Sequence, residues 1–198
     1  MSYKHIFGLV CVAALSAPAV AMPVVYSTSL SGSVESPANA SLGTGTALVT
    51  IDEAAHTMRV VTSFSDLTAG VTASHIHVIN GPGDANFADT NGPVTTTVPT
   101  FPGFPSAVTF GTYDNTFNMT LAGSYNPTFV TAAGGLAAAE SAFFSGITEG
   151  RAYLNIHTTT FPGGEIRGFL RPVPEPATLL LMGAGIGGLV VIRRRRRV

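Results

Sequence analysis

The stretch GRAYLNIHTTTFPGGEIRGFL, residues 150–170, holds two runs of alternating apolar and polar residues on either side of a Phe-Pro-Gly-Gly turn. Because successive side chains of a β-strand point to opposite faces, Leu154, Ile156 and Ile166 all point to one side. The polar positions of the two runs are Tyr153, Asn155, His157, Glu165 and Arg167. The stretch therefore predicts a β-hairpin with an apolar face toward a core and a polar face away from it.

The rest of the central region continues this pattern. Further runs predict strands at 24–31, 46–51, 56–64, 71–79, 94–98 and 116–121. Residues 135–144 are rich in helix formers and predict one short helix. Only 11 % of the residues are charged, which argues against a disordered chain. The expected fold class is all-β, an immunoglobulin-like β-barrel or a Greek-key sandwich with one short helix, followed by a C-terminal transmembrane helix.

Three histidines fall on the polar side of these predicted strands. His75 and His77 are two residues apart within 71–79, so they share a face, and His157 ends the first run of the hairpin. Three imidazoles that converge can hold Cu or Zn and leave one coordination position open. One hypothesis is therefore a metal site made of His75, His77 and His157.

The same face also fits a structural interpretation. In that alternative the histidines bond to backbone groups and Glu165 pairs with Arg167 across the hairpin, with Tyr153 and Asn155 as further members of the network. An isolated histidine, His56, alternates with apolar residues and is expected to be structural. The spacing leaves both interpretations of the polar face open, and it assigns no catalytic residue.

Several of these segments together resemble one known family. The segments are SHIHV at 74–78, GLAAAE at 135–140, GRAYLNIHT at 150–158 and PGGEIRG at 162–168. They are similar to the CHRD domain, named for chordin and also found in exported bacterial proteins, and the similarity covers about residues 26–171. The resemblance implies an immunoglobulin-like β-barrel and carries over no activity. The chain departs from the family pattern by a Phe-, Pro- and Thr-rich insertion at 95–106.

The His-x-His strand has a second, narrower similarity. Copper–zinc superoxide dismutase also carries metal histidines that face outward from a β-barrel, but only His75 and His77 match that pattern. Its disulfide has no counterpart here, because the single cysteine, Cys11, lies in the N-terminal segment. Dismutase activity is therefore a minor variant of the metal-binding hypothesis.

The N-terminal residues 1–21 predict a secretory signal peptide. A short basic start precedes an apolar run of about ten residues, and small residues stand at Ala19 and Ala21. Signal peptidase is expected to cleave after Ala21, which leaves residues 22–172 as the β domain.

The C-terminal residues 173–198 predict a membrane-sorting tail. An uncharged stretch at 177–192 is long enough for a short transmembrane helix, and the basic residues after it are expected to stay on the cytoplasmic side. The flanking signals are Pro174, Glu175 and Pro176 before the stretch and Arg193, Arg194, Arg195, Arg196 and Arg197 after it. This order of parts resembles the PEP-CTERM sorting signal of Gram-negative bacteria. The resemblance implies processing by an exosortase and delivery to the cell surface or the exopolysaccharide matrix.

The charge of the central domain limits its partners. Residues 22–172 hold four arginines and ten carboxylates, and such an acidic domain offers no electrostatic footprint for nucleic acid. The leading interpretation is an exported, non-enzymatic surface or matrix module that binds a protein or a polysaccharide. The alternative is a histidine-based Cu or Zn protein.

Overall fold

The computed structural model describes residues 22–84 and 91–174. Its strands are β1 Val24–Ser31, β2 Thr44–Asp52, β3 Thr57–Ser65, β4 Val71–Val78, β5 Gly111–Asn118, β6 Ala152–Thr158, β7 Ile166–Phe169 and β8 Arg171–Pro172. Its α-helices are α1 Pro127–Ala133 and α2 Leu136–Thr148, and two 3₁₀ turns are η1 Gly32–Val34 and η2 Ala122–Ser124. The mostly β class is confirmed.

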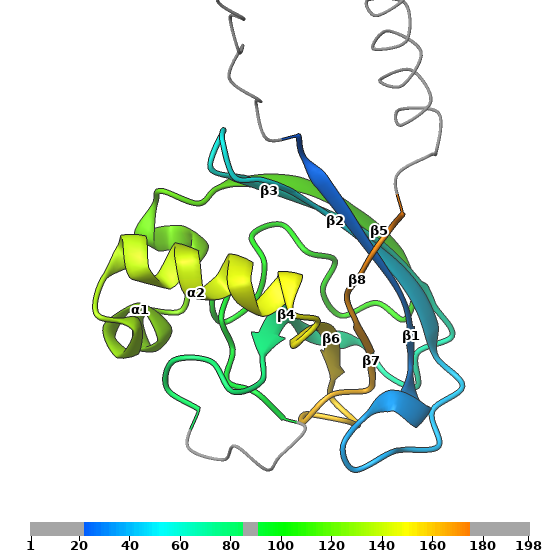
Figure 1. Ribbon diagram of the computed structural model, residues 1–198. Coiled ribbons are helices and arrows are strands. Elements are labelled where there is room, and N and C mark those ends of the chain that lie inside the picture. Colours follow the sequence, from blue (N-terminus) through cyan, green and yellow to red (C-terminus); the bar gives the residue numbers. More distant parts are fainter. Residues whose placement is uncertain (1–21, 85–90, 175–198) are drawn as a thin grey trace, which may run out of the picture.

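The strands form one antiparallel sheet in the order β4-β6-β7-β1-β2-β3-β5, with β8 pairing beside β1. The sheet curls around α2, which makes the fold barrel-like (Figure 1). The described ends lie side by side, since the Val173 amide donates to the carbonyl of Val25 over 2.8 Å. The segment after β1 and the β6–β7 turn lie at the opposite end of the domain (Figure 1).

The period-two alternation explains why these strands form. In β2 and β3 the buried positions alternate with exposed ones, and Val49 faces Val60 across the pair with neither side chain exposed. On the helical side, Phe143 and Ile147 of α2 are fully buried in the same core. Burial of these apolar surfaces is the main favourable term in folding.

The helical prediction needs correction, because the described chain has two α-helices instead of one. Residues 135–144 correspond to α2, but α1 was missed. Asn126 caps α1 by accepting from the Thr128 amide over 3.0 Å, and Pro127 occupies the first turn, where its missing N–H costs nothing. Gly134 ends α1 in the left-handed conformation that glycine adopts without strain. This Asn-Pro start was a readable signal.

Two strand predictions were also wrong in detail. Residues 94–98 form no strand and make only isolated bridges, His77 to Val94 and Thr96 to Tyr125. Pro93 and Pro99 flank this run, and proline cannot donate to a regular ladder. The run predicted at 116–121 is the end of β5, which begins earlier, at Gly111.

The Phe- and Pro-rich insertion at 95–106 instead runs irregularly along the free edge of β4. The Phe101 amide donates to the carbonyl of Ser74 over 3.1 Å, and the rings of Phe101 and Phe104 are buried in the core. The insertion therefore covers an edge that would otherwise be open to pairing with another chain.

The signal peptide at 1–21 and the predicted transmembrane helix at 177–192 lie outside the described residues. Within the described ranges, no single helix has the length and hydropathy to cross a membrane. Together α1 and α2 meet those criteria by composition, but they are bent by 96° relative to each other and bury Phe129 and Phe143 in the core.

Candidate metal centre

The three predicted histidines lie together on neighbouring strands. His75 and His77 are on β4, and His157 is on β6, where it stands opposite Ala73 and diagonal to His75. The ring centroids are 5.1 to 6.0 Å apart, and one nitrogen of each ring lies within 4.8 Å of the others. The small side chain of Ala73 leaves room for this approach. The sequence prediction that these residues share a face is consistent with this register.

Each histidine donates one ring N–H to a backbone carbonyl. His75 Nε2 donates to Pro99 over 2.6 Å, His77 Nδ1 to Gly92 over 2.8 Å and His157 Nδ1 to Pro162 over 3.0 Å. A carbonyl oxygen can only accept, so each of these nitrogens carries the hydrogen. In the neutral ring the second nitrogen then holds a lone pair.

Those second nitrogens are buried and have no hydrogen-bond partner. They are Nδ1 of His75, Nε2 of His77 and Nε2 of His157. Buried polar atoms are normally satisfied, so three unpartnered acceptors in one cluster call for an explanation. The same arrangement, a ring N–H held by a carbonyl and a free lone pair on the other side, is usual for metal-ligating histidines.

Burial also keeps the three rings neutral. Loss of solvation lowers the pKa of His75 to about 4 and that of His77 to about 3, against the opposing hydrogen bonds to Pro99 and Gly92. Burial lowers the pKa of His157 as well. At neutral pH protons therefore do not compete for the lone pairs, which a metal ion needs.

The polar face is covered by three segments far apart in sequence, so it does not face solvent. The segments 91–100 and 159–164 contribute the carbonyls that hold the histidines, and the segment 32–39 contributes the Val34 carbonyl that accepts from Arg167. A Cβ at Gly92 would lie 2.4 Å from the carbonyl carbon of Val78, so only glycine lets that segment approach β4 so closely.

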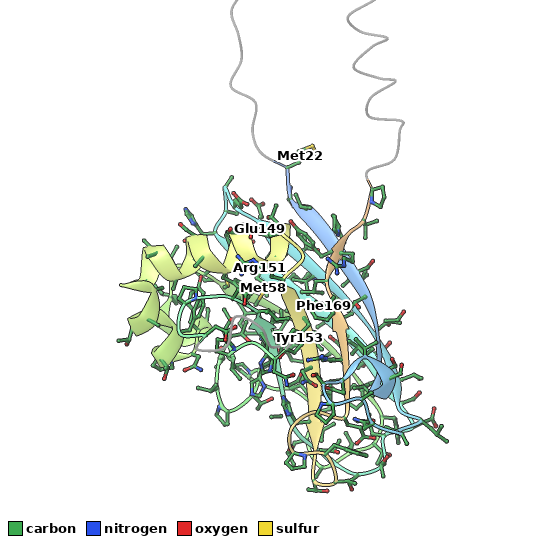
Figure 2. The ribbon with its side chains drawn as sticks, turned by 60° about the horizontal axis from the view of Figure 1, so that its bottom comes forward. Met22, Met58, Glu149, Arg151, Tyr153 and Phe169 are labelled. Atoms are coloured by element: carbon green, nitrogen blue, oxygen red, sulfur yellow. The ribbon has the colours of Figure 1, made fainter. Side chains whose placement is uncertain are left out.

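Tyr153 and Arg167 support the cluster from one side. The ring of Tyr153 stacks on His77 with centroids 4.8 Å apart, and the Arg167 guanidinium lies 4.8 Å from the same ring. The Tyr153 hydroxyl accepts from the Gly92 amide over 3.1 Å, next to the carbonyl that His77 uses. Figure 2 shows Tyr153 beside Phe169 of β7, and their centroids are 5.4 Å apart.

The predicted pairing of Glu165 with Arg167 is not the arrangement in the structure. Glu165 accepts from the Ser41 hydroxyl, the Thr68 amide and the Thr158 hydroxyl, each over 2.6 Å. Burial alone would raise the pKa of Glu165, but these hydrogen bonds lower it below the ordinary value. Glu165 therefore joins the segments that carry Ser41, Thr68 and Thr158, and it does not pair with Arg167.

Glu35 takes the place assigned to Glu165. Its Oε2 lies 3.7 Å from Arg167 Nε, and both side chains are almost fully buried. Burial raises the pKa of Glu35 to about 7, although Arg167 and the Ser36 amide act against this. This partner could not be predicted from the strand pattern, because Glu35 lies in an irregular segment 132 residues from Arg167.

Asn155 lies within the histidine cluster. On β6 it lies two residues from His157, on the same strand face. It is paired with His75 of β4 on one side and with Arg167 of β7 on the other. Its Oδ1 is buried and has no hydrogen-bond partner, and the same is true of Oε1 of Glu35.

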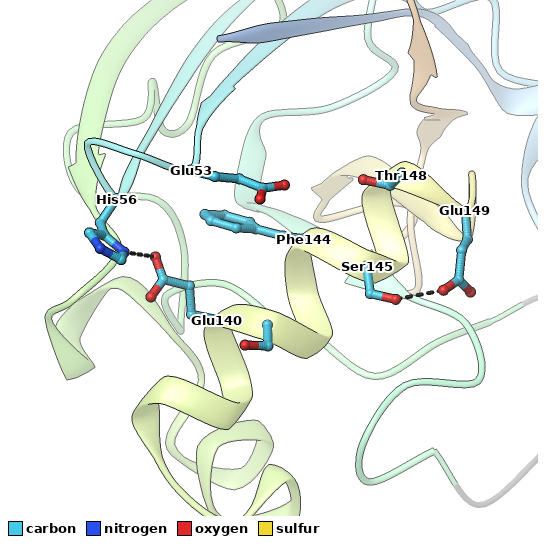
Figure 3. A pocket seen from close by; sticks show the side chains of 8 residues that line it. Glu53, His56, Glu140, Phe144, Ser145, Thr148 and Glu149 are labelled. Carbon is cyan, nitrogen blue, oxygen red and sulfur yellow. Dashed lines mark hydrogen bonds and ion pairs between the residues drawn. The ribbon is translucent and has the colours of Figure 1, made fainter. Parts of the chain in front are cut away.

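A hollow of about 430 Å³ lies apart from this cluster, between the β2–β3 turn and α2 (Figure 3). His56 Nδ1 pairs with Glu140 over 2.9 Å, and Ser145 donates to Glu149 over 2.5 Å. His56 is more than half exposed instead of half-buried, because it belongs to the turn. No unpartnered buried side-chain atom was found among the described residues that line this hollow.

The arrangement of His75, His77 and His157 suits one transition-metal ion. Two nitrogens on a tetrahedral zinc ion are about 3.3 Å apart, so the nitrogens, which lie within 4.8 Å of one another, would draw together by up to about 1.5 Å on binding. Neutral imidazole suits Cu and Zn better than Ca or Mg, which prefer oxygen ligands. Three ligands leave a further coordination position free.

Comparisons with known proteins agree with the two resemblances. A family model described as the CHRD domain matches residues 26–170, and one described as the PEP-CTERM protein-sorting motif matches residues 172–197. Neither a curated protein nor a solved structure matched the chain.

Proposed function

The chain belongs to the CHRD domain family, and from this premise we propose that its domain is a non-enzymatic metal-binding module of the cell surface. One Cu or Zn ion is held by His75, His77 and His157. The observation that carries the proposal is the set of three buried, unpartnered imidazole nitrogens in one cluster.

Export provides the setting for this proposal. The PEP-CTERM motif marks an exported protein whose membrane-anchored precursor is processed by an exosortase. We place the mature domain at the cell surface or in the exopolysaccharide matrix, after signal peptidase cleavage at Ala21. The segment 32–39 and the turn 159–164 lie at the end opposite β8, so they would face away from a membrane that holds the tail.

A structural network alone explains the cluster less well. Such a network would use both nitrogens of each ring, yet each ring uses only one. An unsatisfied buried polar atom costs about 1–3 kcal/mol, and three of them on adjacent side chains are costly to keep without a ligand.

The test is the metal content of the protein. The full chain is expressed in an exporting bacterium, purified without a tag or a chelator, and analysed by inductively coupled plasma mass spectrometry. We expect close to one Cu or Zn per chain, and loss of that metal in His77→Ala and His157→Ala. His56→Ala is the matched control, because it also removes a histidine but leaves the cluster intact, and it should keep the metal.

A metal-free native chain that stays metal-free when offered Cu²⁺ and Zn²⁺ would refute the metal-binding proposal. Intact mass of surface material tests the processing separately. A mass that ends near Pro174–Pro176 supports removal of the tail, and a mass that includes Arg193–Arg197 contradicts it.

A further inference from the structure

We infer that the free coordination position of the proposed ion takes a small neutral ligand with an N–H or O–H group, held by Asn155 and Glu35. This inference rests on the proposed metal-binding function. It assigns a binding role to two residues that otherwise have unsatisfied buried atoms.

The first argument is the position of Asn155. The strand register places it among the three histidines, opposite His75 and on the same strand face as His157. Asn155 is only 2 % exposed, and its buried Oδ1 has no partner. The unsatisfied oxygen therefore belongs to a side chain on the strand face that carries the three histidines.

The second argument is that Glu35 approaches the same space. A Cβ built on Gly164 would lie 2.5 Å from Asn155 Nδ2, 2.8 Å from Asn155 Oδ1 and 2.8 Å from Glu35 Oε1. Both side chains therefore reach the same point beside Gly164, where only glycine, with a φ of +133°, lets them approach so closely. The other oxygen of Glu35 faces Arg167, which fixes the direction of the carboxyl group.

The third argument is chemical. Two acceptor atoms that face one small space are satisfied by a ligand that donates hydrogen bonds. Water meets this requirement, as does a small amine, azole or alcohol, whereas an anion without a hydrogen would leave both oxygens unsatisfied. A metal ion binds such a ligand through its lone pair while the N–H or O–H points to the two oxygens.

A cavity lies next to these residues. It has a volume of about 310 Å³ and lies between the segment 35–39 and the turn 160–164, and Glu35 and Gly164 are part of its lining. Its volume accommodates a ligand of a few heavy atoms. Asn39 donates to the carbonyl of Glu165 over 3.0 Å and thereby joins the two walls.

The test compares imidazole with N-methylimidazole on the Cu²⁺-loaded full chain. Both offer one lone-pair nitrogen, but only imidazole has an N–H, because N-methylimidazole carries a methyl group at that position. Binding is followed by the visible absorption of the bound Cu²⁺, and copper retained after gel filtration is measured at the end of each titration. We expect imidazole to bind about tenfold more tightly, the effect of one well-placed hydrogen bond.

Variants locate the preference. Asn155→Ala and Glu35→Ala should each retain copper and bring the two affinities closer together, whereas Ser36→Ala, which lines the same cavity, should keep the native ratio. Equal affinities in the native chain overturn the inference without any variant. A preference that neither substitution changes also overturns it. If the native chain binds no Cu²⁺, the proposed function fails and the inference fails with it, whereas copper binding without discrimination defeats the inference alone.

Discussion

Two regions of the domain place histidine beside other polar groups, and they differ in how those groups are satisfied. In the hollow beside α2, His56 is exposed and already paired with Glu140 (Figure 3). In the cluster on β4 and β6, His75, His77 and His157 are held by backbone carbonyls and still have free lone pairs. The hollow has a volume of about 430 Å³, yet its buried side-chain atoms are all paired, whereas those of the cluster are not.

The proposed site is thus identified by its unsatisfied buried atoms and not by a concave shape. Water can hydrogen-bond to every polar group in an exposed hollow, so such a hollow needs no ligand. Water does not reach a buried lone pair in the same way, so that lone pair needs another partner. Substitutions in the cluster, in the side chains around it and in the hollow should therefore have different effects.

The largest expected effect is stabilisation by metal. With free Zn²⁺ at about 1,000 times its Kd, linkage adds about 4 kcal/mol to the free energy of unfolding, which raises Tm by roughly 8–16 °C for a domain of this size. Differential scanning calorimetry with Zn²⁺ and then with excess chelator measures the shift. His157→Gln should abolish it and His56→Gln should retain it; the same shift in both variants would place the ion elsewhere.

The next effect is on affinity. Removal of one ligand, in His75→Ala or His77→Ala, should weaken Cu²⁺ or Zn²⁺ binding by about 100-fold or more, above the range for outer-shell changes. Tyr153→Phe, which keeps the ring on His77 and removes the hydroxyl, should weaken it less. Competition with a coloured chelator measures these affinities. An affinity that survives either alanine substitution contradicts the three-histidine site.

The stability of the metal-free protein should depend on pH through the same residues. The pKa values of His75 and His77 fall from 6.5 to about 4 and about 3 on folding, so the unfolded chain binds more protons below pH 6.5 and stability decreases from there to pH 4. Glu35 acts oppositely, because its pKa rises from 4.5 to about 7, and its contribution is present below pH 4.5 and lost as pH rises through 7. The net loss between pH 6.5 and 4 should be on the order of 3 kcal/mol.

Urea denaturation at several pH values checks these signs. His77→Gln should flatten the decrease between pH 6.5 and 4, and Glu35→Gln should make it steeper. If both variants follow the native curve, the buried groups do not titrate as the structure indicates.

The smallest effect is expected in the hollow. His56→Gln breaks an exposed ion pair, and such pairs contribute about 0–1 kcal/mol. The free energy of unfolding should therefore change by less than about 1 kcal/mol, with no change in metal content. A larger loss would mean that the hollow carries more of the stability than its exposure suggests.

The strands and the shared face of the histidines were predictable because both depend on period-two alternation, which is local. The hydrogen-bond and ion-pair partners of the polar side chains could not be predicted in this way. Gly92 and Pro99 hold two rings from one irregular segment, and Pro162 holds the third from the β6–β7 turn. Glu35 reaches Arg167 across 132 residues. The run at 94–98 looked like a strand because it consists of the β-branched residues Val and Thr, but the prolines on each side prevent a ladder.

The most direct test of the metal site is anomalous diffraction from crystals of the metal-loaded protein, recorded at the copper or zinc absorption edge. The account predicts one strong peak about 2.0–2.1 Å from His75 Nδ1, His77 Nε2 and His157 Nε2. A peak between His56 and Glu140, or no peak at the three histidines in a fully loaded crystal, would contradict it.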